Sequence, residues 1–184
     1  MRVRTEHRAN QKKHFGGQGD SQNQGSPPGW DWGEALQSAE RAVEMYRRLA
    51  YDNPIEYEPD LARRLNMLGA FYAALEKPHE ALTVTRESAE IRERLANENP
   101  YMFQAELAMS LSNVGVRSSE LGNVSDAVNA TLRAVEIFEH LPREQRRAFQ
   151  PQLAQTRKNL SEFYGQVRET GESANSADEL LAAA

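Results

Sequence analysis

The chain of 184 residues contains no cysteine. That absence excludes disulfide bonds, thiol nucleophiles and thiolate metal sites. No apolar run reaches the roughly 18 residues that a membrane-spanning helix needs. The first 30 residues also lack the apolar core of a secretory signal. We therefore predict no membrane-spanning segment, and we place the protein in the cytoplasm by default, since the lack of cysteine says little about the compartment.

Groups that could carry out catalysis are also scarce. The sequence has no Gly-x-x-x-x-Gly-Lys-Ser/Thr phosphate loop, and the glycine-rich segment 16–19 has neither a strand before it nor a helix after it. No two histidines share a helix face with a carboxylate at the spacing of a metal site; they are His7, His14, His79 and His140. The sequence predicts a protein that is not an enzyme and needs neither cofactor nor metal.

Charge is divided unequally along the chain. Residues 1–30 carry five cations and two carboxylates, +5 − 2 = +3, so the remainder carries −5 − 3 = −8. An acidic remainder repels nucleic acid, and Phe15 is the one aromatic residue near the cations of the basic segment that could stack on bases. This distribution argues against nucleic acid as a partner.

The clearest pattern in the sequence is an internal repeat of 46 residues. Three segments begin alike at Glu34, Glu80 and Asp126, with spacings of 80 − 34 = 46 and 126 − 80 = 46. The register then continues without a gap. Matched positions include Leu49, Leu95 and Leu141, then Leu61, Leu107 and Leu153, and finally Leu68, Val114 and Leu160.

Each unit is expected to form two helices. In the first unit, apolar residues recur at steps of three and four over 35–50 and again over 61–75. Asn53-Pro54 is predicted to end the first helix, and Pro59 to lie in the first turn of the second. The predicted helices span about 32–52, 59–76, 78–97, 105–121, 124–141 and 146–168, with no sheet. We predict an all-α solenoid of about six helices, stacked as antiparallel pairs, because one pair cannot bury its apolar stripe alone.

The composition divides the chain into three parts. Residues 1–30 are predicted to be a disordered leader, 31–168 the helical repeat domain, and 169–184 a flexible tail. The array is thus expected to open on an unpaired helix. Near its end, Arg157 replaces the leucine of earlier units and Ser161 replaces their glycine. These polar residues predict a helix face that nothing covers.

The repeated residues resemble the tetratricopeptide repeat. Its pattern of leucine, leucine-glycine and an aromatic residue occurs as Leu65, Leu68-Gly69 and Tyr72. The next unit repeats it as Leu111 and Val114-Gly115, with Ser118 in place of the aromatic residue. The resemblance covers roughly residues 31–168. The 46-residue period exceeds the usual ~34 and is similar to long repeats of the kinesin-light-chain type and of bacterial signalling proteins. We expect each glycine to let the next helix approach closely.

In this family the helix that carries the leucine–glycine pattern, here the one with Leu65 and Gly69, is the first helix of each pair. These first helices line a concave groove that holds a peptide or helix. The resemblance therefore implies a groove made of Arg63, Asn66, Ala70, Ala73, Met109, Ser112, Asn113, Val116, Glu120, Gln155 and Asn159. For any one of these residues, the alternative is a solvated helix face. Some members grip a terminal carboxylate with two lysines, an arginine and two asparagines. Only Asn113 matches that set, so we do not expect this activity.

The resemblance implies a non-catalytic scaffold or adaptor whose partner is a protein or peptide. Two alternatives remain. The chain could be a structural domain that self-associates as a homo-oligomer. It could also be a regulatory domain that acts on a separate signalling enzyme or transcription factor.

Overall fold

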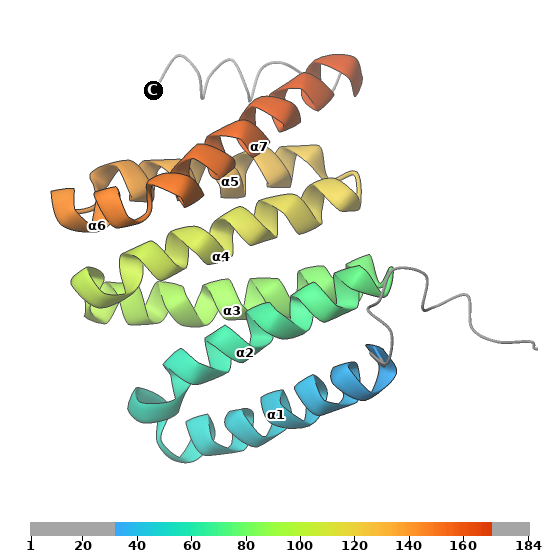
Figure 1. Ribbon diagram of the computed structural model, residues 1–184, viewed down its shortest axis with the longest axis vertical. Helices are drawn as coiled ribbons and strands as arrows, with labels where there is room; N and C mark the ends of the chain where they lie inside the picture. Colours follow the sequence, from blue (N-terminus) through green and yellow to red (C-terminus); the bar gives the residue numbers. More distant parts are fainter. Residues whose placement is uncertain (1–31, 171–184) are drawn as a thin grey trace, which may run out of the picture.

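The computed structural model describes residues 32–170, which form helices without any strand (Figure 1). The helices are α1 Trp32–Asp52, α2 Pro54–Ala74, α3 Pro78–Glu98, α4 Pro100–Glu120, α5 Val124–His140, α6 Arg143–Ala148 and α7 Gln150–Thr170. The predicted all-α fold is confirmed. The predicted leader 1–30 lies outside the described residues, as does the tail beyond Thr170, so both stay predictions.

The chain zigzags between two layers of helices (Figure 1). The helices α2, α4 and α7 form one layer; behind it, α3 packs against α2 and α4, and α5 packs against α4 and α7. The first helix, α1, packs against α2 at one end of the stack, and α7 packs on α5 at the other end. This is the predicted solenoid of stacked helix pairs.

Burial follows the 46-residue register. Leu61, Leu107 and Leu153 are only 5%, 6% and 4% exposed, so equivalent positions lie in equivalent surroundings. One cluster of buried residues comes from α1, α2 and α3, and another comes from the chain between α3 and α7. Both clusters contain residues of α3, and Phe103 packs against both, so the core is continuous across α3. The repeat predicted from the sequence is therefore a repeat of packing as well.

Two glycines allow the layers to approach closely. A Cβ atom added to Gly69 would lie 3.3 Å from the carbonyl oxygen of Ala81, and one added to Gly115 would lie 3.1 Å from that of Ala127. Either Cβ would also collide with a threonine hydroxyl of the facing helix. The close approach predicted at these glycines is confirmed.

Two helices begin earlier than predicted. They start at Pro54 and Pro100 rather than near residues 59 and 105, and Pro59 lies inside α2. The prolines at 54 and 100 occupy the first helical position, where the missing N–H costs nothing. Asn99 caps α4, because its side-chain oxygen accepts a hydrogen bond from the backbone N–H of Met102 at 3.2 Å. The prediction that Pro59 opens the helix is wrong.

The segment predicted as one helix over 146–168 forms two helices, α6 and α7. The described range therefore holds seven helices rather than about six. Leu141, with φ −58° and ψ 148°, ends α5 in an extended conformation before Pro142. As predicted, α7 turns polar residues outward, since Ser161 is exposed and the Arg157 side chain is 59% exposed.

Candidate functional site

The helices α2, α4 and α7 lie in one layer (Figure 1), and the face of this layer that carries the predicted groove residues is the candidate site, here termed the candidate groove. None of the eleven predicted groove residues is buried. Five are exposed: Arg63, Ala70, Asn113, Glu120 and Gln155. Six are half-buried: Asn66, Ala73, Met109, Ser112, Val116 and Asn159.

A chain of polar contacts joins α2 to α4 along this groove. The Asn113 amide donates to the side-chain oxygen of Asn66 at 3.3 Å, and the Asn66 amide donates to the hydroxyl of Ser110, also at 3.3 Å. Part of the hydrogen-bonding capacity of Asn66 is therefore used within the protein. Asn113 keeps its carbonyl oxygen outside any hydrogen bond with the described residues, so it remains able to accept one from a ligand.

Similar contacts join α4 to α7. The hydroxyls of Ser112 and Thr156 lie 3.1 Å apart, and Ser119 donates to the side-chain oxygen of Gln166 at 3.0 Å. On α7 itself the Gln155 amide donates to Asn159 at 2.8 Å. Hydrogen bonds thus join all three helices of the candidate groove.

A buried arginine beneath the groove was missed by the sequence analysis. Arg92 of α3 is 5% exposed and donates to the Ser110 hydroxyl at 2.6 Å and to the Glu106 carbonyl oxygen at 3.1 Å. Its Nε lies 3.8 Å from the Glu106 carboxylate and has no hydrogen-bond acceptor among the described residues. Burial lowers the pKa of Arg92, and the Glu106 charge opposes that shift. Arg92 supports the asparagine–serine chain from below.

The signal that could have revealed Arg92 is a break in the repeat. Positions 46 residues away on either side hold Tyr46 and Phe138, so a core position of this register holds a cation in one unit. In the first unit the equivalent contact places Arg64 of α2 over the Tyr46 ring, 4.1 Å from its centroid. In both units a guanidinium group therefore occupies this contact, supplied by α2 in the first unit and by α3 in the second.

Met67 was also missed. It lies 113 − 67 = 46 residues before Asn113, and its exposed fraction is 53%. The register therefore places Met67 at the groove position of Asn113 and Asn159. Together with the half-buried Met109, it gives the groove two flexible apolar side chains.

The groove carries little net charge. Arg63 forms an ion pair with Asp60 on its own helix, and Arg117 pairs with Glu120 at 2.7 Å. The charged members predicted from the sequence thus have neighbouring counter-charges. This arrangement suits a ligand recognised through backbone and apolar contacts rather than through charge.

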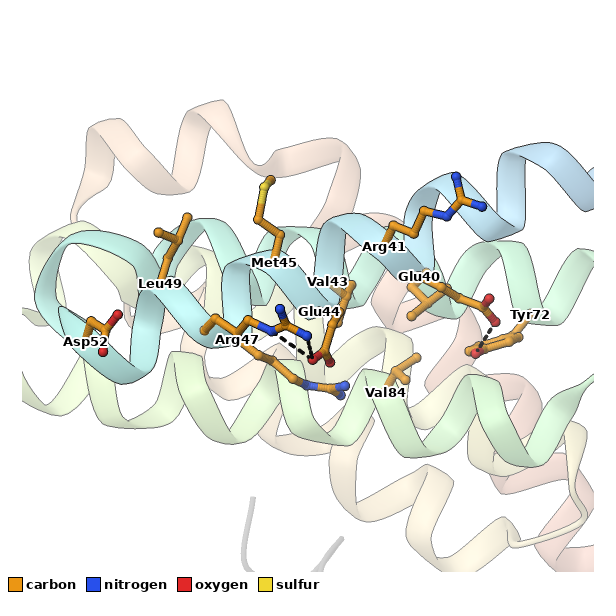
Figure 2. A pocket seen from close by; sticks show the side chains of 12 residues that line it. Glu40, Arg41, Val43, Glu44, Met45, Arg47, Leu49, Asp52, Tyr72 and Val84 are labelled. Carbon is orange, nitrogen blue, oxygen red and sulfur yellow. Dashed lines mark hydrogen bonds and ion pairs between the residues drawn. The ribbon is translucent and has the colours of Figure 1, made fainter.

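Other kinds of site are not evident in the described part of the chain. Residues 32–170 hold no group of three His, Cys, Asp or Glu side chains that could hold a metal ion. Within the same range, no helix has the length and apolar character to cross a membrane. A hollow of about 750 Å³ lies beside α1 rather than in the groove (Figure 2).

Stacked antiparallel helix pairs define an α-solenoid repeat protein, and the sequence comparison is consistent with that class. Residues 61–100 match the family model of the tetratricopeptide repeat. The match covers most of α2 and all of α3, the helix pair that contains the Leu65, Gly69 and Tyr72 pattern. No match was found among curated protein sequences. Tetratricopeptide repeats are generally protein–protein interaction modules.

Proposed function

We propose that this protein is a non-catalytic scaffold or adaptor that holds a segment of another protein in the groove of α2, α4 and α7. The observation that carries the proposal is the groove's composition in the 46-residue register. Met67 and Met109 offer adaptable apolar contacts, and Asn113 offers a free carbonyl oxygen beside them. Alanines at 70 and 73 leave room for the ligand's backbone.

The expected ligand is a peptide or helix with an apolar anchor and few charges. Its apolar side chain would lie against the two methionines, because these are the flexible apolar groups of the groove. Its backbone N–H would donate to Asn113. The paired charges at Arg63 and Glu120 leave no uncompensated cation for a terminal carboxylate. A cytoplasmic location and kinship with kinesin-light-chain-like or bacterial signalling arrays belong to the same proposal, and both are supported only by sequence features.

A peptide selection tests this function. Peptides selected from a random library on the full chain should bind it and lose affinity for the variant Met67→Glu/Asn113→Glu. Two charges placed in the groove's centre are expected to weaken binding by at least about tenfold, roughly 1.4 kcal/mol.

The matched control is Thr83→Glu/Asn129→Glu, which adds the same charge at two exposed positions of α3 and α5 that are also 129 − 83 = 46 residues apart. This control should bind the peptides as the unaltered chain does. Equal loss of binding in both variants, or peptides that ignore the groove variant, would refute the proposal.

A further inference from the structure

One face of α1 is covered by no other described helix. Its residues are Ala35, Ser38, Ala42, Met45 and Leu49, here termed the α1 open face. In the 46-residue register their counterparts on α3 are Ala81, Val84, Ser88, Ile91 and Leu95, all between 0% and 8% exposed. Those counterparts pack toward α2. Met45, by contrast, is 52% exposed.

Figure 2 shows how two side chains of the α1 open face are oriented. Met45 and Leu49 point to the side of α1 opposite Val84 of α3. The α1 open face is thus mainly apolar, with Ser38 as its one polar member. The equivalent face of α3 packs against α2, the helix before it in the chain.

The sequence before α1 does not carry the pattern that would cover this face. The residues 46 positions before Leu61, Leu65 and Leu68 are Phe15, Gly19 and Gln22. Two of the three leucines that anchor α2 therefore have no apolar counterpart. A cover built like α2 is not encoded at that place.

The opposite end of the solenoid is unsuited to pair with the α1 open face. The outer face of α7 carries Arg157 and Ser161 where α4 has Leu111 and Gly115. Arg157 is engaged in an ion pair with Glu139 at 2.6 Å. Head-to-tail stacking of copies would bury these polar groups against Met45, which is unfavourable.

The charges beside the α1 open face are instead self-complementary. Arg41 and Asp52 flank Met45 and Leu49 at helical spacing, both are exposed, and neither forms an ion pair within residues 32–170. If two copies of α1 run antiparallel with Met45 opposite the partner's Leu49, paired positions sum to 45 + 49 = 94. Arg41 then faces position 53, adjacent to the partner's Asp52, and two-fold symmetry repeats this contact.

We propose that two copies of this chain dimerise through the α1 open face as an antiparallel helix pair. Met45 packs against the partner's Leu49, and Arg41 forms an ion pair with the partner's Asp52. One helix of 21 residues is about 31 Å long, so the interface lies at the small end of specific interfaces, about 1,200 Å². We therefore expect a micromolar dissociation constant. The dimer would present two grooves, which allows avidity for a partner with two binding segments.

Analytical ultracentrifugation of the full chain tests the interface. The unaltered chain should pass from monomer to dimer as its concentration rises through the micromolar range. Met45→Glu/Leu49→Glu should raise the dissociation constant at least about tenfold, because it places charges at the dimer's centre. Circular dichroism should show an unchanged fold, since Met45 is exposed and Leu49 is only half-buried in the monomer. The control Ala154→Glu/Ser161→Glu, on the outer face of α7, should dimerise normally.

A charge exchange tests the orientation of the pair. Arg41→Asp alone and Asp52→Arg alone should each weaken self-association, because each leaves like charges opposed. An equimolar mixture of these two variants should form heterodimers, because every contact then joins opposite charges. A chain that stays monomeric at all concentrations would overturn the proposal. So would loss of the dimer in the α7 control, failure of the mixture to associate, or a dimer that forms only after residues 1–30 are removed.

Discussion

At the scale of single residues, one contact of the repeat is made by different side chains in each unit. The pair is Tyr46 with Arg64 in the first unit and Arg92 with Ser110 in the second. The third unit has Phe138 and Thr156, which are 1% and 2% exposed. The same space is thus filled twice with a guanidinium group and once without any charge. The charge is therefore not required by the packing.

This comparison leads to a prediction for Arg92. The variant Arg92→Phe/Ser110→Thr copies the third unit. Its free energy of unfolding should lie within about 1 kcal/mol of that of the unaltered chain, or above it. The reason is that replacing a buried charged group by a packed apolar one is often neutral or stabilising. Ser110→Ala should lose about 1–3 kcal/mol, because the buried guanidinium then loses an acceptor. Urea denaturation measures both. A double variant less stable than Ser110→Ala would contradict this account.

Two glycine substitutions should have opposite effects. Gly115→Ala should destabilise the chain by roughly 1–3 kcal/mol, because its Cβ would press on the facing helix. Gly165→Ala lies on α7 with nothing within 4 Å of the added Cβ, so it should stabilise by up to about 1 kcal/mol through helix propensity. Thermal denaturation of both variants provides the comparison, and a shift of the same sign in both would show that close approach is not the reason for Gly115.

Tyr72 gives a prediction about alkaline pH. Burial, together with a hydrogen bond of 2.9 Å to Glu40, raises the pKa of Tyr72 to about 12. The fold therefore favours the protonated phenol. The resulting stabilisation is complete below the ordinary pKa of 10.0 and is lost as the pH rises toward 12.

Nuclear magnetic resonance of the Tyr72 ring carbon can follow this titration. Glu40→Gln should lower the pKa of Tyr72, because it removes the carboxylate that accepts the hydrogen bond. An unchanged titration in that variant would show that the contact with Glu40 is absent in solution.

The sequence predicted the repeat-related residues well and the exceptions poorly. Leu61, Leu107 and Leu153 are buried alike because the 46-residue offset encodes their position directly. Met67 could have been added to the groove from the same offset. The hydrogen bonds of Asn66 could not, because they depend on how far α2 and α4 are apart, which periodicity does not specify. Arg92 breaks the pattern, and its partners are visible only in three dimensions.

At the scale of helices, two equivalent turns use different residues. Both follow the same hydrogen-bond pattern, with Lys77 N–H to the Tyr72 carbonyl and Asn123 N–H to the Ser118 carbonyl, each at 2.9 Å. The preceding residue has a positive φ in each, 75° at Gly122 and 55° at Glu76. A left-handed conformation costs a residue with a side chain about 1–2 kcal/mol, whereas glycine adopts it freely.

Glu76→Gly should therefore stabilise the chain by roughly 0.5–1 kcal/mol, less than the full strain because glycine is also more flexible when unfolded. Chemical denaturation measures this change. Gly122→Glu is the reverse substitution and should destabilise the chain. A stabilising Gly122→Glu would show that the left-handed turn is not formed as described.

Helix boundaries show where local sequence rules compete. Both Pro54 and Pro59 are compatible with a first turn, and the prediction chose the later one. The structure begins α2 at the earlier proline, and Pro59 then lies inside the helix, where it cannot donate the usual backbone hydrogen bond to the carbonyl of residue 55. In the third unit the Asn-Pro pair is missing, and Pro142 instead separates α5 from the short helix α6. The repeat predicted the number of helix pairs but not this local rearrangement.

At the scale of the whole molecule, ion pairs join α1 to α3 and α3 to α5. Arg47 of α1 contacts Glu87 of α3 at 2.5 Å, and Glu93 of α3 contacts Arg133 of α5 at 2.8 Å. Arg47 and Glu93 occupy equivalent positions, as do Glu87 and Arg133, so the two contacts have exchanged their charges. Such exposed pairs contribute little stability, about 0–1 kcal/mol each. Their opposite arrangement favours one neighbour over another and so helps to keep the units in order.

The groove depends on this order, because it is formed by three helices from three successive units. The most direct measurement of its role is site-specific photo-crosslinking to a peptide selected on the full chain. A photoreactive residue placed at position 67, 113 or 159, all related by the 46-residue offset, should crosslink to the peptide. The same residue at position 83 of α3 or position 129 of α5 should not. Crosslinks at 83 and 129 with none at 67, 113 and 159 would contradict the assignment of the groove as the binding surface.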